Sequence, residues 1–239
     1  MSLYRCNGIV LRTYKLGEAD RIISIVTDTH GKVRAVAKGI RKTKSRIGAR
    51  LEPMSHVSLL IYQGRGDLDI VSQAESIENY RSVREDLDRL THASALLEAV
   101  DLLSVEGKVD DRLYGMLGGA LRSLNQHDSA LLVPAFYWKL LAHEGYEPSL
   151  EECVRCGGDG DIVGFDPAAG GVTCRACTVG LRVSDAAIDL MRRILGGQLA
   201  GALREPASAV THEVERLATA SLEHQLERRL KAGRLLDHV

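Results

Sequence analysis

The chain has 239 residues, and its hydrophobic content of 45% and charged content of 26% are typical of a globular protein. That length is enough for two domains with separate cores. No apolar run approaches the roughly 20 residues of a membrane span, and the first residues lack the apolar segment of a signal peptide. We therefore expect a cytoplasmic protein without a membrane partner.

The net charge of −1 conceals an uneven distribution along the chain. Residues 1–80 carry thirteen Lys and Arg against eight Asp and Glu, whereas residues 81–239 carry eighteen against twenty-four. A basic part joined to an acidic part suggests that the first part meets an anionic partner.

Residues 3–77 have the pattern of β-strands. In residues 32–39, Val33, Ala35 and Ala37 alternate with Arg34, Val36 and Lys38, and this period of two indicates a half-buried strand with a basic outer face. Five short strands within residues 1–79 favour a small closed barrel, with an OB-fold as the first choice and an SH3-like barrel as the second. The predicted strands are Leu3–Tyr14, Arg21–Asp28, Lys32–Gly39, Val57–Tyr62 and Leu68–Ala74.

The most basic stretch, residues 38–50, lies between the third and fourth predicted strands and contains no acidic residue. A solvated loop is the plainest interpretation of such a run. Like charges without counter-charges repel one another, however, so an anion would stabilise them, and phosphate is the anion we favour. The predicted phosphate-contacting residues are the six cations of this stretch and two further arginines: Arg34, Lys38, Arg41, Lys42, Lys44, Arg46, Arg50 and Arg65.

From Tyr80 onward the hydrophobic period becomes that of helices. One predicted helix begins near Leu132, with Pro134 in its first turn, and ends at Gly145. Ser184 is the predicted N-cap of another helix that runs to about Leu195. A last helix is expected over roughly residues 211–236. Residues 80–239 are therefore predicted to form a helical second domain, interrupted by a module at about residues 150–181.

That module contains two C-x2-C pairs separated by seventeen glycine-rich residues. This spacing suits one tetrahedral ion held by four thiolates, and a closed sphere of four protein ligands indicates a structural rather than a catalytic site. Zinc is the expected cofactor, as one structural ion. An iron site uses the same ligands and remains an alternative, and disulfides would need an oxidising compartment. The predicted ligands are Cys153, Cys156, Cys174 and Cys177.

The sequence lacks the common motifs of nucleotide hydrolysis, zinc proteases and serine hydrolases. Gly31-Lys32 and Gly107-Lys108 are each followed by Val, so neither completes a P-loop. The chain contains no H-E-x-x-H motif and no G-x-S-x-G elbow, and its histidines have no spacing that indicates a triad. We therefore expect a protein that is not an enzyme.

The order of these features resembles the RecO family of bacterial DNA repair proteins. The resemblance covers essentially the whole chain, and it is the order and spacing of several short stretches together that make it specific. These stretches are Gly8–Arg12, the Gly17–Arg21 turn, Ala37–Ser45 followed by Leu51–Pro53, and Phe136–Pro148 running into Cys153.

The resemblance implies an α+β protein, with an N-terminal OB-fold followed by a helical domain that carries an inserted four-cysteine zinc module. It also implies binding of single- and double-stranded DNA, which would associate the protein with the nucleoid, and annealing of complementary strands. The implied partners are RecR, the C-terminal tail of single-strand-binding protein (SSB) and, indirectly, RecA, which is loaded onto SSB-coated DNA. The alternatives are an RNA-binding protein with an OB-fold and a zinc ribbon, and a transcription-associated zinc ribbon that acts through protein partners.

Overall fold

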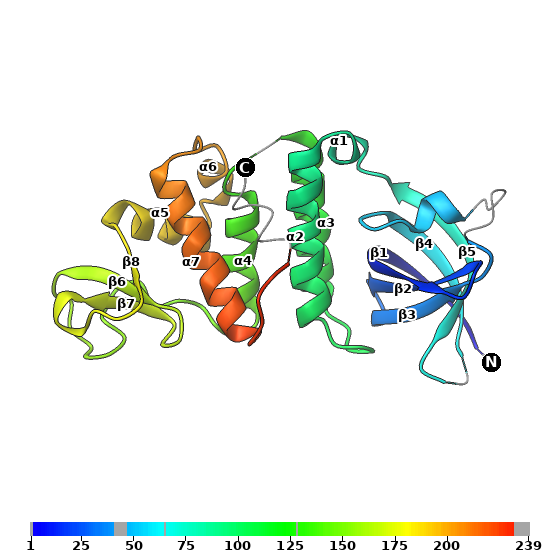
Figure 1. The fold of residues 1–239 in the computed structure, drawn as a ribbon, viewed down its shortest axis with the longest axis horizontal. Helices are drawn as coiled ribbons and strands as arrows, with labels where there is room; N and C mark the ends of the chain where they lie inside the picture. Colours follow the sequence, from blue (N-terminus) through cyan, green and yellow to red (C-terminus); the bar gives the residue numbers. More distant parts are fainter. Residues whose placement is uncertain (1, 41–46, 65, 128, 232–239) are drawn as a thin grey trace. The chain divides into compact units, whose positions relative to one another are not determined.

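Figure 1 shows a computed structural model of the chain, which describes residues 2–40, 47–64, 66–127 and 129–231. The chain divides into two compact units, Met1–Gln126 and His127–Val239, and each is described by itself. The predicted division between residues 79 and 80 stays a prediction.

The first unit begins with five strands that form a closed barrel in the order β1-β2-β3-β5-β4, with β4 also paired to β1 (Figure 1). The pairs are antiparallel except β3 and β5, which run parallel. A five-stranded barrel of this topology is an OB-fold, so the first of the two predicted barrels is confirmed. The strands are β1 (Leu3–Leu16), β2 (Asp20–Thr27), β3 (Gly31–Ala37), β4 (His56–Tyr62) and β5 (Asp69–Glu78), with a 3-10 turn, η1 (Gly48–Leu51), before β4.

Alternation along β3 directs small residues inward, as the sequence predicts. Val33, Ala35 and Ala37 are buried in the barrel core, whereas Arg34 and Val36 are partly exposed. Short side chains on this strand leave room for the branched residues of β2 and β4 across the narrow barrel interior.

Two long helices follow the barrel within the first unit. Helix α2 begins after Asp86, whose carboxylate accepts hydrogen bonds from the backbone N–H groups of Asp88 and Arg89. Its inner face contributes Ala95, Leu96 and Val100 to the buried residues. The helices of this unit are α1 (Arg81–Arg84), α2 (Leu87–Leu103) and α3 (Asp111–Gln126).

The second unit packs three longer helices, α4, α5 and α7, against one another. Predicted signals for two of them are confirmed: α4 has Pro134 in its first turn, and the Ser184 hydroxyl caps α5 by accepting from the Ala187 N–H. The helices are α4 (Leu132–His143), α5 (Asp185–Leu195), α6 (Leu199–Ala202) and α7 (Ala209–Gln225).

The predicted end of the last helix at residue 236 was wrong. Helix α7 ends at Gln225, because Glu227 adopts a left-handed backbone conformation (φ 48°) and the Arg228 N–H turns back to the Glu223 carbonyl. This pattern ends a helix by satisfying its last carbonyls. The Leu230 N–H then bonds the Glu223 carboxylate, and Leu230 is buried. Residues 232–236 lie outside the described residues.

A small sheet interrupts the helices of the second unit, in the order β7-β6-β8. Strands β6 and β7 lie between the two cysteine pairs in the sequence, and β8 follows the second pair. A 3-10 turn spans the second pair from Arg175 to Cys177. The elements are β6 (Ile162–Asp166), β7 (Gly171–Cys174), η2 (Arg175–Cys177) and β8 (Leu181–Arg182).

Candidate functional site

The four predicted metal ligands converge on one point. The sulfur atoms of Cys153, Cys156, Cys174 and Cys177 all lie within 4.8 Å of one another, and those of Cys156 and Cys174 are 3.8 Å apart. A zinc ion bound tetrahedrally at about 2.3 Å from each sulfur separates the sulfurs by about 3.8 Å. The donor set therefore fits such an ion, and the four cysteines could hold a metal.

Backbone geometry prepares the first cysteine pair for a cation. Gly157 turns the chain in the left-handed region (φ 71°), and its N–H bonds the Cys153 carbonyl at 2.8 Å. Backbone N–H groups of Cys174, Arg155 and Cys156, with Cys174 first, donate to the Cys153 sulfur and outweigh the effect of burial, so the pKa of this thiol falls to about 6. A thiolate stabilised in this way is ready to act as a ligand near neutral pH.

The first cysteine pair is also tied to the sheet by an ion pair. Arg155, inside the Cys153–Cys156 knuckle, donates to Asp166 at the end of β6, with Nη2 2.6 Å from Oδ2. The second knuckle has its own arginine, Arg175, which pairs with the exposed Asp161 at 2.7 Å. Burial raises the pKa of Asp166, but hydrogen bonds from Arg155, Ala169 and Ala168 outweigh burial, and the pKa lies below its usual value.

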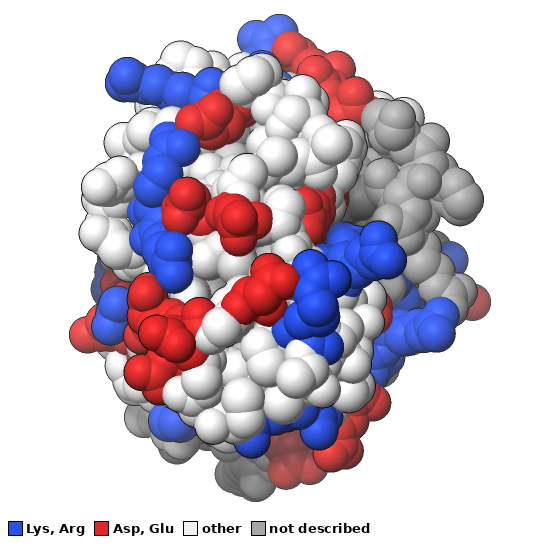
Figure 2. Space-filling view, turned by 90° about the vertical axis from the view of Figure 1, so that its left-hand side faces the viewer, with Lys and Arg blue, Asp and Glu red and all other residues white. Residues whose placement is uncertain are grey.

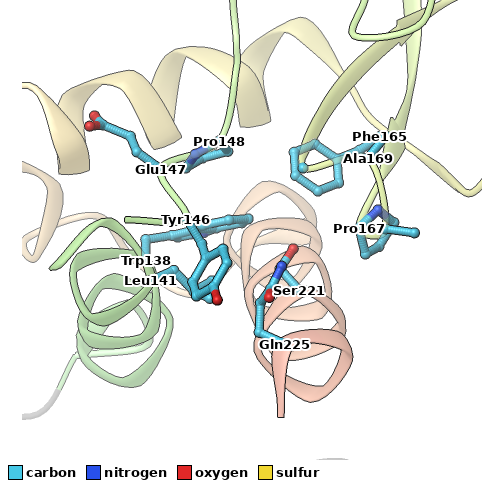
Figure 3. Close-up of a pocket in the computed structure, with 12 residues that line it drawn as sticks. Trp138, Leu141, Tyr146, Glu147, Pro148, Phe165, Pro167, Ala169, Ser221 and Gln225 are labelled. Carbon is cyan, nitrogen blue, oxygen red and sulfur yellow. The ribbon is translucent and has the colours of Figure 1, made fainter. Parts of the chain in front are cut away.

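A pocket of about 350 Å³ lies beside this module, between α4, the β6–β7 turn and α7 (Figure 3). Its walls are mostly apolar. On the wall from α4, the indole of Trp138 meets Phe165 edge to face, with ring centroids 5.8 Å apart. The other lining residues are Leu141, Tyr146, Glu147, Pro148, Pro167, Ala168, Ala169, Gly170, Ser221 and Gln225.

A shallower groove adjoins the pocket and shares Pro167 and Ala168 with it. It carries the exposed Arg228 and Arg229 just beyond α7, together with Glu223 and Glu227. Glu223 is already engaged by the Leu230 N–H.

Three of the eight predicted DNA-contacting residues fall within the described part of the chain. Lys38 is exposed directly after β3, and Arg34 lies on the outer face of that strand, 3.6 Å from Glu106. Arg50, in η1, is exposed and donates to the Ala74 carbonyl at 2.9 Å. The remaining five, Arg41, Lys42, Lys44, Arg46 and Arg65, lie outside the described residues.

Three tyrosines of the barrel, which could stack on nucleic-acid bases, differ in their exposure and in their contacts. Tyr4 stacks on His30 at 4.0 Å, and its hydroxyl bonds Asp69, so burial and this bond raise its pKa well above the usual value. Tyr14 and Tyr62 are each 44% exposed. Arg12 lies over the Tyr14 ring, 5.9 Å from its centroid, which gives that tyrosine a cationic neighbour.

Opposite charges are interspersed on the face of the protein shown in Figure 2, where Lys and Arg lie beside Asp and Glu. Ion pairs of the second unit include Arg192 with Glu151 at 2.9 Å and Arg193 with Glu205 at 2.8 Å. Among the described helices, none is long and apolar enough to cross a membrane.

Sequence reasoning missed the pocket and the ion pair beside it. Trp138 and Phe165 are separated by a turn, two cysteines and a loop, and Arg155 and Asp166 by a glycine-rich segment. The only signal in the sequence was the single tryptophan, for which helix core is the plainer interpretation.

Comparison with known proteins identifies the family. Residues 1–80 match the family described as "Recombination protein O N terminal", and residues 84–234 match "Recombination protein O C terminal". The chain is 42% identical to a DNA repair protein RecO of Frankia casuarinae, with all of both chains covered. It is 42% identical to one of Streptomyces griseus, over 99% of this chain and all of the relative. It is 46% identical to one of Rubrobacter xylanophilus, over 74% of this chain and 72% of the relative. With these matches spanning both units, the chain belongs to the RecO family of DNA repair proteins.

Proposed function

We propose that the protein binds single- and double-stranded DNA, anneals complementary strands and acts with RecR to load RecA onto SSB-coated single-stranded DNA. The observation that carries this proposal is the full-length match to RecO proteins, joined to an OB-fold whose third strand leads directly into a run of cations. Strands of OB-folds are a common platform for single-stranded nucleic acid.

The proposed mechanism is electrostatic and needs no covalent chemistry. Two DNA strands repel each other, and a surface that holds cations against both backbones lowers this repulsion and raises their local concentration. The cations proposed to do so are Arg34, Lys38, Arg41, Lys42, Lys44, Arg46, Arg50 and Arg65. Because backbone phosphates carry no sequence information, binding should depend little on sequence.

Zinc is the ion proposed for the four cysteines, as a structural cofactor. Four thiolate ligands leave no position for water or substrate, and the sulfur spacing suits a tetrahedral ion of this size. When bound, the ion would hold the two knuckles and the sheet between them together.

The SSB tail is proposed to dock on the second unit. Such a tail is acidic and apolar, and the pocket under Trp138 offers apolar walls beside a groove that carries Arg228 and Arg229. An apolar side chain in the pocket with a carboxylate near these arginines would satisfy both properties.

The decisive experiment is annealing of two complementary single strands, bare and pre-coated with SSB, at low and moderate salt. Acceleration on coated strands that fades as salt rises is expected. Acceleration on bare strands alone would remove SSB from the proposed partners and leave the DNA surface. Absence of acceleration in both cases, with tighter binding to a matched RNA oligonucleotide, would favour the RNA-binding alternative.

A further inference from the structure

The turn between β6 and β7 forms one wall of the pocket. The side chain of Asp166 supports this turn, together with the backbone hydrogen bond from the Gly170 N–H to the Asp166 carbonyl. Asp166 is 4% exposed. Its Oδ1 accepts from the backbone N–H groups of Ala168 and Ala169, at 3.0 and 3.3 Å. Both alanines and Pro167 line the pocket, so the position of this wall follows the position of the Asp166 carboxylate.

The other oxygen of the same carboxylate contacts the first cysteine knuckle. Asp166 Oδ2 accepts from Arg155 Nη2 at 2.6 Å and from Arg155 Nε at 3.2 Å. Both donors meet the same oxygen, while the Ala168 and Ala169 N–H groups hold Oδ1, so the two oxygens of the carboxylate are each held by a different partner. Arg155 lies between Cys153 and Cys156, so an ion that fixes both sulfurs also fixes the backbone from which Arg155 extends.

A second connection runs through the backbone. The Val154 N–H, also inside the first knuckle, bonds the Val172 carbonyl of β7 at 3.0 Å. Ser149 exchanges backbone hydrogen bonds with Gly170 and Val172, which joins the chain just after the pocket residue Pro148 to the far side of the turn. The first knuckle and the pocket wall are therefore parts of one hydrogen-bonded layer.

The opposite wall of the pocket carries Trp138, whose fluorescence would respond to a change in this hydrogen-bonded layer. Trp138, the single tryptophan of the chain, is 1% exposed and packs on Phe165, the residue before Asp166. Among the described residues, its indole Nε1 has no hydrogen-bond partner although it is buried. A buried donor of this kind is costly unless a ligand supplies an acceptor. Figure 3 shows the indole extending from α4 toward the space that Phe165, Ser221 and Gln225 enclose.

We propose that Arg155 and Asp166 are positioning residues that couple metal binding at the four cysteines to the shape of the pocket under Trp138. The metal fixes the first knuckle, the knuckle fixes Arg155, and Arg155 holds Asp166 and the turn in the positions they have in this structure. As far as the occupant is concerned, this inference rests on the proposed docking of the SSB tail. The coupling between metal and pocket stands independently of that occupant.

Such coupling is reciprocal. If metal increases the affinity of the pocket for a peptide by some factor, the peptide must increase the affinity for the metal by the same factor. Because one ion pair and two hydrogen bonds to backbone N–H groups link the knuckle to the wall, a change of about tenfold is expected, within the usual range of coupling between sites.

The experiment uses the full-length chain and two variants that remove matching arginines. Arg155→Met removes the guanidinium of the first knuckle, whereas Arg175→Met removes that of the second knuckle, whose partner Asp161 does not line the pocket. Zinc content, Trp138 emission, acrylamide quenching of that emission and affinity for a synthetic acidic–apolar SSB-tail peptide are measured. Each is measured before and after zinc is removed with a chelator and restored.

In the parent chain, zinc removal is expected to increase quenching of Trp138 and to weaken peptide binding about tenfold, and zinc addition should reverse both. Zinc-loaded Arg155→Met should retain one zinc but show the quenching and affinity of the stripped parent. Zinc-loaded Arg175→Met should behave like the loaded parent.

Two results would overturn the coupling: Trp138 quenching that does not respond to zinc, or a zinc-loaded Arg155→Met protein with the quenching of the loaded parent. A Trp138 response to zinc without any peptide binding would support the coupling and would instead refute the docking of the SSB tail. The loaded variants keep the test informative even if the stripped protein unfolds.

Discussion

At the scale of single residues, the environment of each cysteine decides how it can act. The Cys153 thiol is surrounded by backbone N–H donors that lower its pKa to about 6, and its sulfur faces three others. Cys6, by contrast, is buried in the barrel core, where burial raises its pKa to about 12. Hydrogen bonds with the neighbouring cysteines, Cys156 first, raise the pKa of Cys177 to about 12 as well. What distinguishes the cluster from Cys6 is therefore the convergence of four sulfurs on one point rather than the pKa of any single thiol.

Replacing one ligand should remove the metal. Cys174→Ser is expected to lose bound zinc and to destabilise the second unit by about 3 kcal/mol or more, because an incomplete site no longer links the two knuckles. Metal analysis and thermal unfolding measure the two effects. Cys6→Ala is the control, and it should retain one zinc. A Cys174→Ser protein that binds zinc as tightly as the parent would show that the ligand set is wrong.

His56 provides a pH-dependent contribution in the first unit. Burial, together with the charge of Arg122, lowers its pKa below the usual 6.5, and its Nε2 lies 2.6 Å from the Tyr114 hydroxyl. Because the folded state disfavours the protonated ring, the contribution is complete above about pH 6.5 and is lost as pH falls through the lower, folded-state pKa.

The free energy of unfolding should therefore fall between pH 7.5 and pH 5, and it should fall less in His56→Gln. Urea unfolding at several pH values measures the difference. The exposed His127 offers the matched control, and His127→Gln should follow the parent. Equal slopes for the parent and His56→Gln would contradict the assignment.

At the scale of elements, the position of the basic segment follows from the barrel. Strand β3 ends at Ala37, so the cations begin where the outer face of the sheet ends. Arg34 and Lys38 are the described members that connect this face to the segment, and Tyr14 lies two strands away in the same row as Ile22 and Val36.

Neutralising part of the segment should weaken DNA binding at every sequence. If about five phosphates are contacted, the parent should show a log–log salt slope of roughly −3 to −4 for single strands. The triple change Arg41→Ala, Lys42→Ala and Lys44→Ala should flatten this slope by about 2. A control with the same loss of charge replaces Lys15, Lys108 and Arg112, all exposed and outside the predicted set. Equal slopes in the triple variant and the parent would remove the segment from the DNA site.

Helix α2 is fixed to the barrel by a buried acidic residue. Asp101 is 8% exposed. Its carboxylate accepts from the Ser24 hydroxyl at 2.9 Å and lies 3.0 Å from Lys32 Nζ, and Arg12 is 3.6 Å away. Removing a partner from a buried pair leaves an uncompensated charge, which is costly.

Asp101→Ala should therefore destabilise the first unit by about 3 kcal/mol. Glu85→Ala breaks an exposed pair with Arg81 four residues away and should change stability little. Chemical unfolding of both variants distinguishes these outcomes, and equal effects would show that the buried pair does not hold α2 to the barrel.

At the scale of the whole molecule, the helices after the barrel belong with it. Ile9 and Val26 are buried, yet neither is part of the barrel core. They point outward, and Ile9 approaches Gly118 of α3. The barrel therefore needs α2 and α3 to cover part of its outer surface, whereas the family's N-terminal match ends at residue 80.

This arrangement distinguishes two possible domain boundaries. A fragment of residues 1–126 should unfold cooperatively, whereas residues 1–79 should be markedly less stable, because exposing two buried isoleucine- or valine-sized side chains costs about 1.5–3 kcal/mol each. Circular dichroism during thermal unfolding compares the fragments. If residues 1–79 are as stable as residues 1–126, the predicted boundary at residue 79 is the better description.

Local patterns in the sequence determined the elements, the cysteine cluster and the family. Alternation in residues 32–38 and the cap at Ser184 depend on near neighbours, and two C-x2-C pairs define their own ligand set. The end of α7 was missed because one residue, Glu227, leaves the helical conformation while the apolar period continues to Leu230.

Only the tertiary structure decided which distant residues meet. Asp101 meets Lys32, Arg155 meets Asp166, and Trp138 meets Phe165, and none of these pairs has a spacing that a helix or strand would predict. Periodicity reports which face of an element is buried, but it does not report what covers that face. The amino-acid sequence alone thus determined the barrel, the helices and the group of four cysteines, whereas the pocket beside these cysteines exists only because packing brings its walls together.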